Sequence, residues 1–141
     1  QIAFIPNRFQ AFCVSEPSAQ YSLVNSKRIK IVNSCRDRDG VLRRAHGQGR
    51  LNKKYDDPAR LEVRFAPAWL SFLSAVWGDY WVLEIDSDYS VVLVGSPDRK
   101  YLWVLARNES IPKDIYRDLL VIAQEKGFNP SLMVAGDGSV D

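Results

Sequence analysis

Cysteine, histidine and long hydrophobic runs are scarce in this sequence of 141 residues. It contains two cysteines and one histidine. Two cysteines do not make a Cys-type metal site and allow at most one disulfide. No segment approaches the ~18 consecutive apolar residues that a membrane-spanning helix needs. We therefore predict no metal and no other cofactor, and no transmembrane helix.

An excess of charge of one sign is also missing. Nineteen Lys and Arg face seventeen Asp and Glu, which leaves a net charge of +2. So small a charge does not indicate a nucleic-acid surface, and we expect no nucleic-acid partner. The segment that starts at Gln1 has no signal-peptide pattern, so either the chain is cytosolic or a leader precedes it. A hydrophobic content of 46% is typical of a globular protein, and the length suits one domain.

Short strands dominate what the sequence does contain. Residues 78–107 hold three apolar runs, separated by turn residues at 86–88 and 96–99. Pro97 favours a type I turn in the second break. This pattern predicts a meander of three strands, the last of which leads directly into a helix.

Further strands precede the meander. The pattern predicts a hairpin of strands 18–23 and 28–34, strands at 44–51 and 61–65, and a fragment at 1–5. In the strand at 44–51, one face carries Ala45, Gly47 and Gly49. Since these residues are small, we expect that face to leave room for something else.

One amphipathic helix is predicted at about 112–126. Pro112 suits its first turn and Gly127 its C-terminal end. The Gly-rich tail at 135–141 is expected to be disordered. These elements predict an all-β fold over residues 1–134, an eight-stranded antiparallel up-and-down β-barrel with the helix packed outside.

The segment from Pro67 to Trp77 is unusually apolar for a loop. Two interpretations stay open: it tucks into the core as a helical turn, or it forms an exposed tip that touches a membrane or another subunit. Its large apolar residues are Trp69, Leu70, Phe72, Leu73 and Trp77.

Four segments together resemble the lipocalins, and within them the group of bacterial outer-membrane lipocalins, temperature-induced lipocalins and apolipoprotein D. They are 6–10, 78–89, 101–107 and the helix at 112–127. The Gly-x-Trp motif that opens lipocalins would fall just before Gln1, so we expect the chain to lack its own beginning. That tryptophan would stack against Arg107 at the barrel floor.

The resemblance implies a cavity for a small hydrophobic ligand, a fatty acid or lysophospholipid. It aligns cavity positions with Tyr21, Asn33, Phe65, Tyr80 and Trp103, and alternation adds Ile29, Ile31, Leu61, Val63, Val82, Tyr101 and Leu105. The alternative is that these side chains merely fill the barrel. Asn33 separates the two interpretations, because a buried amide needs a polar partner.

Four basic residues are placed at the open end by this fold: Arg36, Arg38, Arg99 and Lys100. They either attract the phosphate or carboxylate of an amphiphile or are ordinary solvated charges. The barrel also brings Cys13 and Cys35 together near its mouth. Their disulfide would imply a periplasm or cell envelope, and two buried free thiols are the alternative.

No catalytic motif is apparent, and we predict that the chain is not an enzyme. His46 falls on a polar strand face, where it is expected to be exposed. By alternation, Glu84 lies on the same strand face as Tyr80 and Val82, and we expect it to pair with a nearby basic residue. A bulge in the strand would instead turn it outward. Two functions remain: lipid storage or transport in envelope maintenance, and an interaction module, a homodimer included, with a filled barrel.

Overall fold

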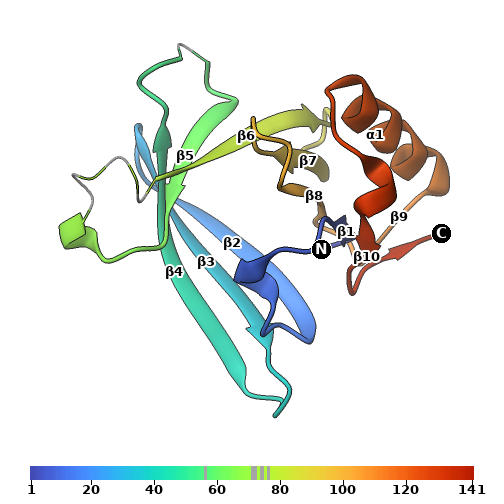
Figure 1. Ribbon diagram of the computed structural model, residues 1–141, viewed down its shortest axis with the longest axis horizontal. Coiled ribbons are helices and arrows are strands. Elements are labelled where there is room, and N and C mark those ends of the chain that lie inside the picture. Colours follow the sequence, from blue (N-terminus) through green and yellow to red (C-terminus); the bar gives the residue numbers. More distant parts are fainter. Residues whose placement is uncertain (56, 71–72, 74, 76) are drawn as a thin grey trace. The chain divides into compact units, whose positions relative to one another are not determined.

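The computed structural model describes residues 1–55, 57–70, 73, 75 and 77–141, with backbone alone for Phe9 and Ala68. These residues form two compact units (Figure 1). The hairpin unit is Cys13–Tyr80, and the helix unit is Gln1–Phe12 together with Trp81–Asp141. Strand β6, Gly78–Ile85, begins in the hairpin unit and ends in the helix unit.

The hairpin unit is an antiparallel sheet of long strands in the order β2-β3-β4-β5-β6. Its strands are β2 (Ser15–Asn25), β3 (Arg28–Arg36), β4 (Leu42–Leu51) and β5 (Arg60–Arg64). The turn between β2 and β3 is closed by the Asn25 side chain, which accepts a hydrogen bond from the backbone N–H of Lys27. A 3₁₀ turn, η2 (Ala68–Leu70), follows β5.

The helix unit continues the strand order as β6-β7-β8-β1-β10. Its strands are β1 (Ala3–Phe4), β7 (Val91–Gly95), β8 (Leu102–Ala106) and β10 (Val134–Ala135). A separate parallel pair joins β9 (Ser110–Ile111) to β11 (Ser139–Val140). Two 3₁₀ turns, η1 (Arg8–Gln10) and η4 (Pro130–Leu132), complete the unit.

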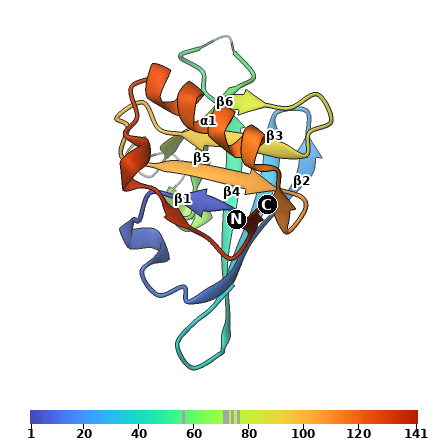
Figure 2. The same ribbon diagram turned by 90° about the vertical axis from the view of Figure 1, so that its right-hand side faces the viewer.

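One α-helix, α1 (Lys113–Glu125), lies across the strands of the helix unit (Figure 2). Its residues Leu119 and Ala123 pack with Leu93 and Leu102 in a buried hydrophobic cluster. Other large members of this cluster are Ile2, Val104, Ile111 and Phe128. Each fully buried leucine of this kind contributes about 1.5–3 kcal/mol by leaving water. The core of this unit therefore lies between the helix and strands β1, β7 and β8.

Arg99 stabilises the C-terminal end of α1. Its Nε donates a hydrogen bond of 3.1 Å to the carbonyl oxygen of Lys126, one of the carbonyls that a helix end leaves unpaired. Gly127 follows with φ +89°, a conformation that favours glycine. The positive charge of Arg99 also interacts favourably with the negative, C-terminal end of the helix dipole.

The predicted fold class is confirmed, with an antiparallel up-and-down strand order and one helix near the C-terminus. Two details were wrong. The main sheet has nine strands in the described residues instead of eight, because β10 adds to β1. The tail at 135–141 is not disordered: Gly136 N–H donates to the Ile2 carbonyl, and β11 pairs with β9, so the two chain ends are held together.

Candidate functional site

One face of the hairpin unit carries all of the predicted cavity residues that belong to this unit. The register sets Tyr21 opposite Ile31 and Ile31 opposite Gly47, and the next row runs from Leu23 through Ile29 and Gly49 to Val63. Because side chains alternate along a strand, both rows point to the same side. The predicted cavity residues in this unit are Tyr21, Ile29, Ile31, Asn33, Leu61, Val63, Phe65 and Tyr80.

The glycines of β4 are covered by larger side chains on this face. A Cβ atom on Gly49 would lie 2.7 Å from Cγ1 of Ile29, and one on Gly47 would lie 2.7 Å from Cε1 of Phe65. Both distances are far shorter than van der Waals contact. The space that we expected these small residues to leave is therefore filled, directly over β4, by Ile29 and Phe65.

A pair of tyrosines lies at the edge of the same face. The hydroxyl oxygens of Tyr21 and Tyr80 are 2.8 Å apart and share a hydrogen bond. Burial raises the pKa of Tyr21, and burial together with the neighbouring Tyr21 raises the pKa of Tyr80 well above its usual value. Both hydroxyls are therefore protonated at neutral pH. One of them donates to the other, so the pair retains one proton for a further acceptor.

Asn33 shares this face, opposite Ala45, but its side chain is exposed. Its amide is therefore open to water and needs no protein partner in this structure. Ile31, on the same strand, is only 2% exposed. The face thus changes from buried in the middle of β3 to open at Asn33.

The predicted residues of the helix unit are organised by a polar cluster. Trp103 donates from Nε1 to Oε1 of Gln10 over 3.0 Å, and its ring stacks on Tyr101. The same Gln10 oxygen accepts from Nδ2 of Asn7, and Gln10 Nε2 donates to Oε1 of Gln1. The segment 7–10 therefore fixes the orientation of Trp103. Val82 and Leu105 are half-buried in this unit.

Sequence reasoning missed Gln10 as the partner of Trp103, and Asn7 as a second donor to the same Gln10 oxygen. The spacing Asn-x-x-Gln in a 3₁₀ turn was the available signal, because residues three apart in such a turn lie on one side. That Trp103 is the partner of Gln10 could not be predicted from the sequence, since the two residues are 93 positions apart in the chain.

Two of the four predicted rim residues are engaged in structural contacts. Arg36 pairs with Glu16 through an N–O distance of 2.8 Å and donates to the carbonyl of Gly40. Arg99 is held at the end of α1, as described above. Arg38 and Lys100 are exposed. If Arg36 and Arg99 bound an anion, they would do so in addition to these structural contacts.

The apolar segment 67–77 divides into residues with different surroundings. Trp69 is 73% exposed and Leu73 is 41% exposed, whereas Leu70 is half-buried. Trp77 is packed on the sheet, where the guanidinium of Arg50 lies 3.7 Å from its ring centre and that of Arg64 lies 5.4 Å away. Phe72 lies outside the described residues. The exposed-tip interpretation thus fits Trp69 and Leu73 but not Trp77.

Cys13 and Cys35 form a disulfide, with Cα atoms 5.6 Å apart. The bond joins the start of the hairpin unit to the end of β3, next to the hydrogen bond between Val14 N–H and the Arg36 carbonyl. The alternative of two free thiols is therefore wrong for this structure.

Three charged residues with open roles have defined surroundings. Glu84 is exposed beside a register shift in β6, and the described residues provide no ion pair for it, so the expected pairing was wrong. His46 is exposed, as predicted. Arg107 donates from Nε to the Tyr89 carbonyl over 2.7 Å.

A shallow groove of about 150 Å³ lies between α1 and the strands of the helix unit. It contains none of the predicted cavity residues; its lining is Glu84, Asp86, Val91, Ile115, Asp118, Leu119 and Ile122. In the described part of the chain, no three His, Cys, Asp or Glu side chains gather as a metal site would require. Nor does that part contain a helix long and apolar enough to cross a membrane.

Comparison with known proteins gives a consistent result. The family model described as "Lipocalin-like domain" matches residues 1–135. Temperature-induced lipocalin-1 of Arabidopsis thaliana is 35% identical over 132 residues, which cover 93% of this chain and 70% of that protein. Apolipoprotein D of Macaca fascicularis is 31% identical, covering 97% and 71%. The outer membrane lipoprotein Blc of Escherichia coli K12 is 27% identical, covering 95% and 71%.

Solved structures agree at the level of the fold. Lobster apocrustacyanin A1 has a TM-score of 0.74 at 14% identity, covering 96% of this chain and 73% of that one. The siderocalin Ex-FABP has a TM-score of 0.64 at 13% identity, covering 99% and 94%. At such low identity these likenesses concern the strand arrangement alone.

Proposed function

Because this chain belongs to the lipocalin-like domain family, we propose that it binds a small hydrophobic or amphipathic ligand, a fatty acid or lysophospholipid, for storage or transport in envelope maintenance. One observation carries the proposal: an apolar sheet face in the hairpin unit ends in a pair of protonated tyrosine hydroxyls. A face of this composition suits an acyl chain with a polar end.

The chemistry of the face indicates how each part of the ligand is held. Each methylene of an acyl chain that leaves water contributes about 0.8 kcal/mol, so Ile29, Val63 and Phe65 supply affinity without polar contacts. The free proton of the tyrosine pair suits an acceptor such as an ester or carboxylate oxygen. An ammonium group, which has no acceptor, gains nothing from that proton.

The same proposal assigns ligand binding to the residues of the helix unit. These are Val82, Tyr101, Trp103 and Leu105, with Trp103 oriented by Gln10. We also propose that Arg36, Arg38, Arg99 and Lys100 attract the anionic end of an amphiphile. Replacing all four with serine should weaken lysophospholipid binding at low salt, and unchanged affinity would remove this part of the proposal.

Native mass spectrometry of the purified chain, followed by titration with oleic acid, tests the main proposal. We expect co-purified lipid, and weaker binding of oleic acid by Phe65→Ala and Tyr80→Phe. Tyr89→Phe is the matched control, since Tyr89 is 65% exposed in a turn of the helix unit. Absence of oleic acid binding to the parent chain would contradict the proposal, and equal affinity in all variants would contradict the assignment of the site to this face.

An interaction module is the second candidate, and the exposure of Trp69 and Leu73 favours it. In this case η2 would dock a partner or a second copy, and no lipid would be needed. Trp69→Ser with Leu73→Ser should then abolish self-association in sedimentation experiments, and neither the parent chain nor the variant should bind oleic acid. A monomeric parent chain would exclude the homodimer.

We further propose a periplasmic or envelope location. The disulfide is stable in an oxidising compartment, and the related Blc is an outer membrane lipoprotein. Alkylation mass spectrometry on protein isolated without reductant tests this location. Two alkylated cysteines would argue for a reducing compartment.

A further inference from the structure

The polar face of the hairpin unit carries an unusual excess of positive charge. It is the side opposite the apolar face described above, and it presents the alternate residues of β2 to β5. The outward positions of β3, β4 and β5 hold one acidic residue, Glu62, against seven basic ones: Arg28, Lys30, Arg36, Arg44, Arg50, Arg60 and Arg64. The whole unit has twelve Lys and Arg against seven Asp and Glu, a net charge of +5.

Most of the acidic partners are already used. Glu62 pairs with Arg50 over 2.9 Å, and Glu16 pairs with Arg36. Arg28, Lys30 and Arg44 are exposed, and their side chains make no hydrogen bond or ion pair with any residue that the structure describes. The register also sets Arg28 directly opposite Arg50, an arrangement in which like charges destabilise a sheet. Glu62 compensates Arg50, but an anion that covers the face would also compensate Arg28, Lys30 and Arg44.

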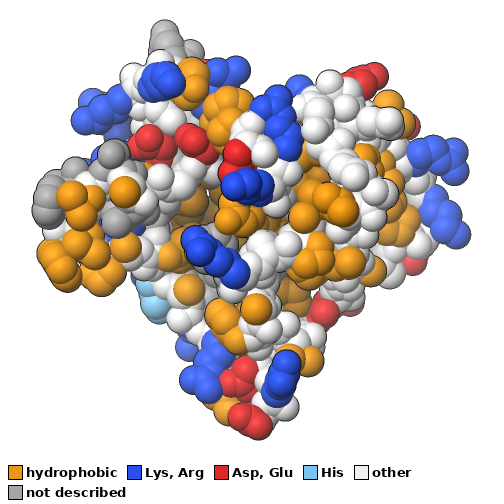
Figure 3. Space-filling model, in the orientation of Figure 1, with side chains coloured by type: hydrophobic (Ala, Val, Ile, Leu, Met, Phe, Trp, Pro, Cys, Tyr) orange, Lys and Arg blue, Asp and Glu red, His pale blue; other side chains and the backbone are white. Residues whose placement is uncertain are grey.

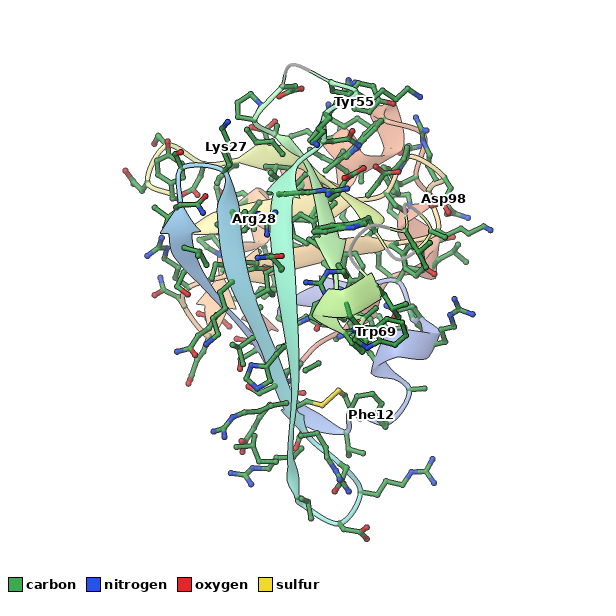
Figure 4. All side chains as sticks on the ribbon, turned by 90° about the vertical axis from the view of Figure 1, so that its left-hand side faces the viewer. Phe12, Lys27, Arg28, Tyr55, Trp69 and Asp98 are labelled. Carbon is green, nitrogen blue, oxygen red and sulfur yellow. A yellow bond between two sulfur atoms is a disulfide. The ribbon has the colours of Figure 1, made fainter. Side chains whose placement is uncertain are left out.

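An apolar projection stands on the same side of the sheet. The ring of Trp77 packs on Arg50 and Arg64, whose side chains belong to the polar face, so Trp77 itself lies over this face. Figure 1 shows η2 standing out from the sheet on this side, and Figure 4 labels Trp69 on it. Figure 3 shows hydrophobic side chains gathered at that end of the hairpin unit. Trp69 is 73% exposed there.

We infer that this basic face of β3 and β4, with Trp69 beside it, is a docking surface for an anionic phospholipid bilayer. Lipid phosphates complement Arg28, Lys30 and Arg44, and the interface between headgroups and acyl chains accommodates an indole ring. A nucleic acid or an acidic protein offers the charge but no apolar layer for Trp69 and Leu73. This docking is independent of ligand binding, because it uses the opposite side of the sheet.

Vesicle co-sedimentation tests the inference on the full chain. We expect binding to vesicles of phosphatidylcholine and phosphatidylglycerol, and none to phosphatidylcholine alone. Each lost basic charge should weaken binding about fivefold, so Arg28→Gln/Lys30→Gln/Arg44→Gln should weaken it about a hundredfold. Binding should also disappear at about 1 M salt, where the Debye length is about 3 Å.

A variant with the same change of net charge controls for position. Lys113→Gln/Arg117→Gln/Lys126→Gln removes three exposed charges of α1 and its end, and it should bind vesicles like the parent chain. Circular dichroism and an unchanged affinity for oleic acid exclude misfolding of either triple variant. Trp69→Ser should weaken vesicle binding. It should also abolish the blue shift in tryptophan fluorescence that the parent chain shows when vesicles are added.

Three results would overturn the inference. Equal loss in both triple variants would show a response to net charge alone. Binding to heparin or single-stranded DNA with no binding to anionic vesicles would indicate another polyanion. Self-association that depends on Arg28, Lys30 and Arg44, without vesicle binding, would make the face an interface between copies.

Discussion

The two units of this chain are stabilised in different ways. Of the thirteen buried hydrophobic residues among those described, eleven belong to the helix unit, and the hairpin unit contributes only Ile31 and Cys35. The helix unit buries an apolar cluster under α1. The hairpin unit relies on long strand pairings, side chains laid over glycines, and a disulfide.

Charge separates the two units as well. The helix unit contains seven Lys and Arg against ten Asp and Glu, a net charge of −3, whereas the hairpin unit has +5. The nearly neutral total therefore hides two surfaces of opposite sign. Net charge over a whole chain is a poor guide to binding when its charges are divided between units in this way.

The largest expected difference concerns the cores. Leu102→Ala should lower the free energy of unfolding by about 2–5 kcal/mol, because Leu102 is fully buried in the helix unit. Leu61→Ala removes the same atoms from a half-buried position of the hairpin unit and should cost clearly less. Urea denaturation measures both, with Leu23→Ala, 82% exposed, as the control. Equal losses for Leu102 and Leu61 would break the comparison.

The disulfide should matter most to the hairpin unit. Replacing Cys13 and Cys35 with serine reopens a loop with a sequence separation of 22 and should cost about 3 kcal/mol in the chain-entropy model. Hydrogen exchange should then accelerate in β2 and β3 more than in β7 and β8. Uniform acceleration would show that the two units unfold together.

Adding a methyl group at a glycine of β4 should destabilise the protein, because larger side chains already pack over these glycines. Gly49→Ala forces its Cβ against Ile29 and should cost about 1–3 kcal/mol. The double variant Gly49→Ala/Ile29→Ala should recover part of that loss, and a double-mutant cycle in urea measures the coupling. Additive effects would show that Ile29 does not occupy the space above Gly49.

The smallest expected effect is a pH dependence in the turn before β7. Asp86 accepts hydrogen bonds from the Ser90 hydroxyl and from the backbone N–H groups of Val91 and Ser90, and these bonds lower the pKa of Asp86 below its ordinary value of 3.8. Since the folded pKa is the lower one, the stabilisation is present above 3.8 and is lost as pH falls through the folded value.

Asp86→Asn should therefore flatten the decline of unfolding free energy as the pH falls below 3.8. Urea melts of the variant and the parent at several pH values measure this difference. Asp88→Asn, in the same turn, is the control and should decline like the parent. A parallel decline in Asp86→Asn would locate the acid sensitivity elsewhere in the molecule.

Local sequence patterns were reliable guides to the strands and the helix. The turn residues at 25–27 and 86–88, and Pro112 with Gly127, act on their nearest neighbours, so their effect is readable without the fold. The bulge in β6 that turned Glu84 outward left no such mark, because it is a property of the pairing between β6 and β7.

Candidate binding residues were readable only as members of a face. Alternation grouped Ile29, Ile31 and Asn33 correctly on one side of β3, but it did not predict that Asn33 is exposed. Arg36, Arg99 and Trp77 were grouped by chemical type as rim or tip residues. In the structure each of them has a partner that the local sequence does not indicate.

The sequence by itself determined which segments form the long strands and the helix, because side-chain periodicity and turn chemistry are local. The tertiary structure alone decided that Phe65 and Ile29 cover Gly47 and Gly49, that Gln10 orients Trp103, and that basic residues gather on one face of the hairpin unit. Each of these contacts joins segments far apart in the chain. Their approach depends on strand register and on close packing, which no single segment encodes.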